Sequence, residues 1–349
     1  MKRVKKILFL APLGIGGISS FAENVKSEWN LENSKLILWR VPRSNISGWI
    51  SYFPKLFLYS AYLVFVRPSI VHVNLASKGS PIRKFPFVII AKILGISVIT
   101  QIHSGKLHEE ILSRSRSSPW RIITTSILSF SQKLIFINQK QMQTLTDEML
   151  VPRSKSYFLA NHVRLPDNVE FEVREPVFDA IFIGRVTIEK GALDLLQSIR
   201  GLQHLSLSFA FVGDIQIPGY SVGLVEINNH KVTFFGEVSN SAAMELLCKS
   251  RILVLPSYSE NFPMVILEAF ARGKPVISTR VGEIENVISE FLDGSLVEAG
   301  DVKRLTDAMA AYFDSPSEIV IQGKNARLKA EMRYDIRNYA ERLSKIYVS

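Results

Sequence analysis

Short apolar runs alternate with helix-length segments along most of the chain, as in KKILFL (5–10), SIVHVNL (69–75), FDAIFIG (178–184) and RILVLPS (251–257). Such runs of β-branched and apolar residues, without polar alternation, are typical of strands buried on both faces of a parallel sheet. Helical segments between them predict βαβ units. The chain is therefore expected to be α/β, with open, doubly wound, Rossmann-like parallel sheets.

A charged and proline-containing stretch, LPDNVEFEVREPVF (165–178), interrupts this alternation. At 349 residues the chain is long enough for two domains. We predict an N-terminal Rossmann-like domain at 1–165, a linker at 166–176 and a second Rossmann-like domain at 177–325, the two domains facing each other across a cleft. Helices at 326–349 are expected to pack back toward the N-terminal domain.

No segment is predicted to cross a membrane. The most apolar stretch, LFLYSAYLVFV (56–66), ends at Arg67-Pro68 and is shorter than the roughly 20 residues that a transmembrane helix needs. The start, MKRVKKILFLAPLGIGG, is interpreted as a first strand and its loop rather than a secretory signal. The single cysteine, Cys248, forms no internal disulfide. These features favour a cytoplasmic protein.

Charge is divided unevenly. Residues 1–165 contain 23 Lys and Arg against 7 Asp and Glu, a balance of +16, and the remainder carries −6, which together give the net +10 of the chain. A basic N-terminal half favours an anionic partner, either nucleic acid or a membrane surface. No nucleic-acid-binding motif accompanies the charge. The segments 45–67 and 113–121, rich in cations and aromatic residues, favour an anionic membrane surface, with a solvated loop and a core helix as the alternative.

One predicted strand is followed by GRVTIEKG (184–191), where Gly184 ends the strand and Arg185 and Lys190 precede a helix. Two cations beside a helix N-terminus suit a diphosphate, and a solvated basic loop is the alternative. After the next strand, Gly213 in FVGDI permits a close approach of the backbone.

A third strand end carries SYSENFPMVILEAF (257–270), in which Glu260 and Glu268 lie eight positions apart. Pro263 suits the first turn of a helix, so the amides of Met264 and Val265 would point from its start. A carboxylate accepts hydrogen bonds from two adjacent hydroxyls, such as those of a ribose. Cations, helix-start amides and carboxylates at neighbouring strand ends predict a nucleotide-sugar site.

The segments GRVTIEKG, FVGD, FFGEVS and PSYSENFPMVILEAFARGKPVIST resemble the donor-binding half of the retaining GT-B glycosyltransferases, specifically glycosyltransferase family 4. Glu260 and Glu268 match the E-x7-E motif of that family. The resemblance is strong over about residues 178–300, whereas the N-terminal half matches in outline only. A second glycine usual after Asp214 is missing, so the diphosphate loop is expected to differ in shape.

The resemblance implies roles for individual residues. Arg185 and Lys190 would hold the diphosphate, Glu268 the ribose, and Glu260 the transferred sugar. His103, at the end of the strand VITQIH, would lie near the reaction centre, with packing as the alternative. The catalytic residues would thus be His103, Glu260, Arg185 and Lys190. Donor-binding residues would be Gly16, Gly17, Gly184, Gly213, Phe234 (in the base pocket), Asn261, Phe262, Pro263, Met264, Val265 and Glu268.

The implied reaction is retaining transfer of a hexose from a UDP- or GDP-linked sugar to a glycan or lipid-linked acceptor, in the synthesis of a bacterial cell-surface polysaccharide. The acceptor would be met at the inner face of the membrane. No cofactor and no metal are expected, because two cations neutralise the diphosphate and no D-x-D motif is present. The alternatives are a nucleotide-sugar epimerase of similar architecture, in which E-x7-E is not expected, and a non-catalytic nucleotide-sugar binder. A nicotinamide dehydrogenase is poorly supported, since LGIGGISS does not complete G-x-G-x-x-G.

Overall fold

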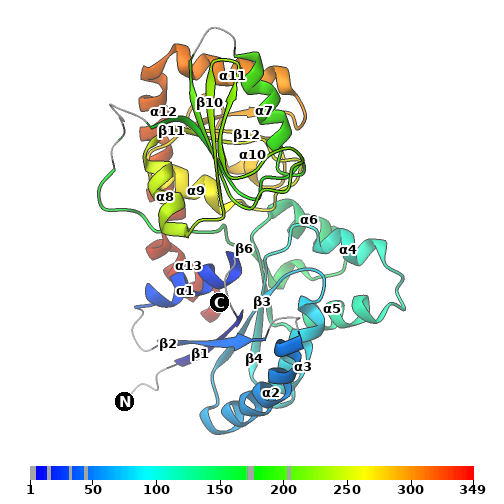
Figure 1. Cartoon of the computed structure of the whole chain (residues 1–349). Coiled ribbons are helices and arrows are strands. Elements are labelled where there is room, and N and C mark those ends of the chain that lie inside the picture. The colour runs from blue at the N-terminus through cyan, green and yellow to red at the C-terminus, as the bar shows by residue number, and fades with distance from the viewer. Residues whose placement is uncertain are drawn as a thin grey trace. The chain divides into compact units, whose positions relative to one another are not determined.

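The computed structural model of the chain describes residues 5–13, 17–30, 34–42, 46–169, 171, 177–202 and 206–349. The chain forms two compact units, and each is described by itself (Figure 1). Unit 1 comprises residues 1–161 and 336–349, and unit 2 comprises residues 162–335.

Unit 1 is built on a six-stranded sheet with the order β2-β1-β3-β4-β5-β6, in which all neighbouring pairs are parallel. Its elements are β1 (Lys5–Pro12), α1 (Gly17–Ser27), β2 (Ser34–Val41), α2 (Ile46–Val66), β3 (Ile70–Leu75), α3 (Ser80–Ile93), β4 (Ser97–Ile102), α4 (Leu107–Ser113), α5 (Pro119–Phe130), β5 (Lys133–Phe136), α6 (Gln139–Asp147), the 3-10 turn η1 (Arg153–Lys155), β6 (Ser156–Phe158) and α13 (Ile336–Val348).

Successive residues of β1 enter two different cores, as the unbroken apolar run predicts. Leu8 and Leu10 belong to the core under α2, α3 and α5, whereas Ile7 and Phe9 belong to the core under α1 and α13. Helices α1 and α13 lie side by side, although one is near each end of the chain (Figure 1). The first sheet is therefore covered on both faces.

Unit 2 contains a seven-stranded sheet with the order β13-β12-β11-β7-β8-β10-β9, in which only the edge strand β9 is antiparallel to its neighbour. Its elements are β7 (Phe178–Ile183), α7 (Ala192–Gly201), β8 (Ser208–Val212), β9 (Gly223–Ile227), β10 (His230–Gly236), α8 (Asn240–Cys248), β11 (Ser250–Leu255), α9 (Met264–Ala271), β12 (Val276–Thr279), α10 (Ile284–Val287), β13 (Gly294–Val297), α11 (Val302–Asp314), α12 (Pro316–Lys329) and the π-helical turn η2 (Ala330–Tyr334).

The two Rossmann-like parallel-sheet domains predicted from the sequence are confirmed, with β9 and β13 as strands that the sequence pattern missed. The division of the chain differs from the predicted limits. Val163 bridges Asp335 within unit 2, so the chain passes between the units at 161–162 and again at 335–336. Of the C-terminal segment 326–349, α13 belongs to unit 1, while residues 326–335 belong to unit 2.

Helix α2 ends at Val66, directly before Arg67-Pro68, where the sequence predicted a break. In the described part of the chain, no helix combines the length and apolar character needed to span a bilayer.

Candidate functional site: the strand-end loops of unit 2

The second sheet has a topological switch point between β7 and β11. From β7 the chain moves to β8 on one side, and from β10 it returns to β11 on the other side. Ligands of open parallel sheets bind beyond the carboxyl ends of the strands at such a point, because the two following loops diverge there. The loops that follow β7 and β11 contain Arg185, Lys190 and Glu260, which the sequence singled out.

Two glycines allow the strand-end loops to lie against one another. Gly191 has φ +73°, and a Cβ at this position would lie 1.9 Å from the carbonyl oxygen of Pro256, in the loop after β11. Gly213 has φ +137°, and its Cβ would lie 1.9 Å from the carbonyl oxygen of Gly184, in the loop after β7. Any side chain would force these loops apart, so the close backbone approach predicted for Gly213 is present.

Backbone hydrogen bonds hold the same loops together. The amide of Tyr258 donates to the carbonyl of Glu189 over 2.9 Å, and the amide of Val186 donates to the carbonyl of Asp214 over 2.8 Å. The loops after β7, β8 and β11 thus form one continuous backbone surface.

The predicted diphosphate cation and the predicted sugar-binding acid contact each other directly. Lys190 Nζ lies 2.5 Å from Glu260 Oε1, and Ser257 Oγ donates to the same oxygen over 3.1 Å. Both side chains are mostly buried, at 19% and 12% exposed. Removing one partner of such a pair leaves a poorly solvated charge, so the two constrain each other's position. Arg185 is exposed on the same loop as Lys190.

Helix α9 begins at Met264, and Pro263 is its N-cap with φ −71° and ψ 115°. The expectation that Pro263 lies in the first turn is therefore wrong by one position, because its ψ is extended. Met264 and Val265 then form the start of the helix, where amides have no acceptor within the helix. The preceding residues are anchored: Phe262 packs edge-on against Tyr334 with ring centroids 6.1 Å apart, and the carbonyl of Asn261 accepts from the amide of Glu283 over 3.0 Å.

Glu268 lies in the second turn of α9 and is half-buried. Burial raises the pKa of the Glu268 carboxyl above its ordinary value, and the nearby Arg272 guanidinium opposes that rise. Arg272 donates to the backbone carbonyl of Glu268 over 3.1 Å. A carboxylate with a raised pKa gains from hydrogen-bond donors such as ribose hydroxyls, which favour its charged form.

Phe234 does not face an open pocket in this structure. Its side chain is 1% exposed and stacks on Phe211 at 4.8 Å between ring centroids, with Tyr220 on another side at 5.2 Å. Its placement in a base pocket is therefore corrected to a place in the aromatic core beside β8. Neighbouring positions of the same segment alternate in direction, so a residue next to Phe234 faces the other way.

Unit 1 holds the remaining predicted residues. Gly17 is the first residue of α1, the next helix after β1, whereas Gly16 lies outside the described residues. His103 follows β4, and its Nε2 lies 2.8 Å from Asn74 Oδ1. Because Asn74 Nδ2 donates to the carbonyl of Leu10 over 2.9 Å, Oδ1 is the group that faces His103, and Nε2 carries the proton.

Sequence reasoning missed a buried lysine that contacts Asn74, the partner of His103. Lys84 is 4% exposed, and its Nζ donates to the backbone carbonyl of Asn74 and to Ser80 Oγ. Burial, with a smaller contribution from the Arg83 guanidinium, lowers the pKa of Lys84 to about 7. The available signal was a lysine flanked by the apolar run FPFVII, where a charged residue needs a specific partner.

The family comparison agrees with the half of the chain that carries these loops. Residues 165–330 match the family described as glycosyl transferases group 1. This segment is therefore similar to the group 1 glycosyltransferases. One relative is the putative teichuronic acid biosynthesis glycosyltransferase TuaC of Bacillus subtilis. It is 34% identical over 133 residues, which cover 38% of this chain and 32% of TuaC.

A longer sequence match includes residues of both units. The Campylobacter jejuni N,N'-diacetylbacillosaminyl-diphospho-undecaprenol alpha-1,3-N-acetylgalactosaminyltransferase is 26% identical over 231 residues, covering 62% of this chain and 60% of that protein. The chain thus spans less than two thirds of the length of both relatives. HepE from Anabaena, solved in complex with UDP, has the same fold, with a TM-score of 0.74 at 14% identity, covering 98% of this chain and 99% of HepE.

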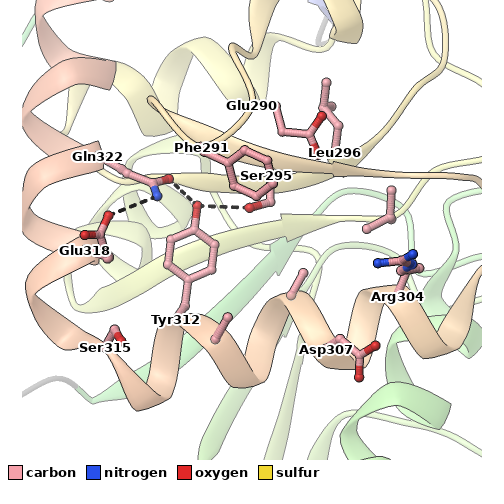
Figure 2. Close-up of a pocket in the computed structure, with 13 residues that line it drawn as sticks. Glu290, Phe291, Ser295, Leu296, Arg304, Asp307, Tyr312, Ser315, Glu318 and Gln322 are labelled. Atoms are coloured by element: carbon pink, nitrogen blue, oxygen red, sulfur yellow. Dashed lines mark hydrogen bonds between the residues drawn. The ribbon is translucent and has the colours of Figure 1, made fainter.

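Unit 2 also contains a cavity of about 480 Å³ between β13, α11 and α12 (Figure 2). Tyr312 lies at one end, where its hydroxyl donates to Gln322 Oε1 over 2.5 Å and accepts from Ser295 Oγ over 3.5 Å. The lining includes three carboxylates (Glu290, Asp307 and Glu318) and one cation (Arg304). This charge balance disfavours a diphosphate, and no predicted site residue lines the cavity.

Within the described ranges, no three His, Cys, Asp or Glu side chains are arranged to hold a metal ion.

Proposed function

We propose that this chain is a retaining glycosyltransferase that moves a hexose from a UDP- or GDP-linked sugar to a glycan or lipid-linked acceptor in bacterial cell-surface polysaccharide synthesis. The observation that carries the proposal is the Lys190–Glu260 contact at the switch point of unit 2. The contact supports the proposal because a lysine suited to a diphosphate and a carboxylate suited to sugar hydroxyls lie at one place. The names of the two relatives support a polysaccharide or lipid-diphosphate acceptor.

The chemistry follows from the charge that develops on the leaving diphosphate. Arg185 and Lys190 stabilise that charge, as do the amides at the start of α9, and groups placed in advance cost little reorganisation during the reaction. Lys190 would exchange part of its contact with Glu260 for the diphosphate, which frees Glu260 to accept hydrogen bonds from the sugar. Glu268 would hold the ribose hydroxyls.

Retention requires that the acceptor attack on the face from which the diphosphate leaves. We propose that a leaving phosphate oxygen takes the acceptor proton, with His103 near the reaction centre. With two side-chain cations on the diphosphate, a metal is not needed for its charge. Chelator treatment should therefore leave turnover unchanged.

Release of nucleoside diphosphate from a panel of UDP- and GDP-sugars tests the proposal with purified protein. Lys190→Ala and Glu268→Ala should each lower turnover of the active donor by about 100-fold or more. Lys249→Ala and Glu245→Ala, an exposed pair on α8, are the matched controls and should retain it. Near-normal turnover in both site variants, with unfolding transitions like the wild type, would refute the donor site. The anomeric configuration of the product, measured by NMR, tests retention.

A further inference from the structure

Helix α2 of unit 1 exposes an apolar face from Ile50 to Phe65. Its exposed large side chains are Ile50, Phe53, Phe57, Leu58, Val64 and Phe65, and they range from 52% exposed at Val64 to 86% at Phe65. Their spacing of three, four and seven residues places them on one side of the helix. Single exposed apolar residues are common on protein surfaces, but a continuous face of this kind marks an interaction site.

Residues on the opposite side of α2 are buried, and they hold the apolar face toward solvent. Tyr52, Tyr59 and Leu63 are at most 5% exposed and belong to the core under the first sheet. The Tyr52 and Tyr59 hydroxyls donate to the backbone carbonyls of Arg83 and Phe87 in α3. The apolar face is therefore held in place by tertiary contacts, and it cannot be buried by rotation of the helix.

The sequence segment that contains α2 and α3 has charge of one sign. Residues 33–108, which contain α2 and α3, include ten Lys and Arg and no Asp or Glu. Arg67 is exposed at the end of α2, Lys55 lies within it, and Lys92 is exposed on the adjacent α3. Apolar side chains flanked by cations match a bilayer surface that contains anionic lipids.

We propose that the apolar face of α2 inserts into the interface of a membrane that contains anionic phospholipid, with the flanking cations on its headgroups. A second copy of the chain is a poorer occupant, because a twofold contact would bring the same cations together. Helix α2 lies on the interface and does not cross it, since no described helix is able to span a bilayer. The inference deepens the proposed function by naming the surface at which a lipid-linked acceptor is met.

Vesicle flotation with the full chain tests this without any donor. Phe53→Ser/Phe57→Ser/Phe65→Ser should lower partitioning onto phosphatidylglycerol-containing vesicles about tenfold or more, because burial of these rings drives insertion. The matched control is Ile321→Ser/Leu328→Ser/Met332→Ser in unit 2, whose side chains are 51–65% exposed, and it should bind as wild type does. Salt at about 1 M, which screens charges beyond about 3 Å, should weaken wild-type binding.

Three results would overturn the proposal. Wild-type protein that ignores vesicle charge, or a triple variant that binds fully, removes the membrane role. A dimer that forms in solution and is lost in the triple variant identifies a second copy as the occupant. If the triple variant fails to fold, Phe65→Ser alone is measured. Because donor hydrolysis needs no lipid, loss of vesicle binding with normal turnover separates this inference from the donor site.

Discussion

The two units share one architecture and differ in what surrounds it. In unit 2 the strand-end loops are pressed together and hold a mostly buried cation–carboxylate pair, Lys190 and Glu260. In unit 1 the most unusual surface is the outer face of α2, with apolar side chains among cations and no acid between residues 33 and 108. Function on Rossmann-like folds is a property of such local features, because the sheet itself is common to many activities.

Two glycines with nearly the same φ angle, one in each unit, show how the packing of the two units differs. Gly191 of unit 2 has φ +73°, and Gly95 of unit 1 has φ +69°. A Cβ at Gly191 would overlap the Pro256 carbonyl, whereas a Cβ at Gly95 would meet no atom within 4 Å. The same residue type therefore serves loop contact in unit 2 and only chain reversal in unit 1.

Gly191→Ala should have the largest effect on stability. The left-handed conformation costs an alanine about 1–2 kcal/mol, and a backbone collision adds about 1–3 kcal/mol. We expect a loss of about 2–5 kcal/mol in the free energy of unfolding of unit 2, together with loss of donor hydrolysis because Lys190 is displaced. Urea unfolding and the nucleotide-release assay measure the two. Full activity in a stable Gly191→Ala protein would show that the loops do not depend on this contact.

Lys84→Met tests the buried cation of unit 1. Burial lowers the folded-state pKa of Lys84 to about 7, below its ordinary value of 10.5. Between these pH values the unfolded chain binds the extra proton, so the stability of the wild type should rise as pH increases. From about pH 7.5 to about pH 9.5 the rise attributable to Lys84 should be on the order of 2 kcal/mol, and Lys84→Met should lack it.

Urea unfolding of both proteins at several pH values below 10 gives that difference, before tyrosines begin to titrate. Equal pH dependence in wild type and Lys84→Met would mean that Lys84 stays charged in the folded state. The effect on His103 is separate. Lys84 donates to the backbone carbonyl of Asn74, and the side chain of Asn74 contacts His103, so Lys84→Met should change the pH profile of turnover and leave donor affinity intact.

The sequence predicted the central strands of both units because a strand buried on both faces is apolar at every position. It missed β9, with the sequence GLVEI, because this strand is mostly exposed and is not part of a longer apolar run. Its pairing with β10 defines it as a strand. The sequence also missed β13, a four-residue edge strand that begins with glycine. Local composition identifies the middle of a sheet better than its edges.

Some features of the candidate site could also be predicted from the sequence, and others could not. Glycines and charged residues after strands were visible in the sequence because loops at carboxyl ends of strands have their own composition. The Lys190–Glu260 contact joins residues 70 positions apart and depends on how two loops dock, which no local pattern records. Phe234 and Pro263 were misplaced for a related reason, since the direction of a side chain and the first residue of a helix are settled by packing.

Gly95→Ala should have the smallest effect and sharpens the comparison most. Gly95 follows the C-terminus of α3, and its amide donates to the carbonyl of Lys92 over 3.0 Å. An alanine there meets open space, so only the backbone conformation is penalised, by about 1–2 kcal/mol. Donor hydrolysis should not change, because no loop of unit 2 is involved. If Gly95→Ala destabilised the protein as much as Gly191→Ala, the backbone conformation alone would explain both, and the close loop contact of unit 2 would lose its assigned role.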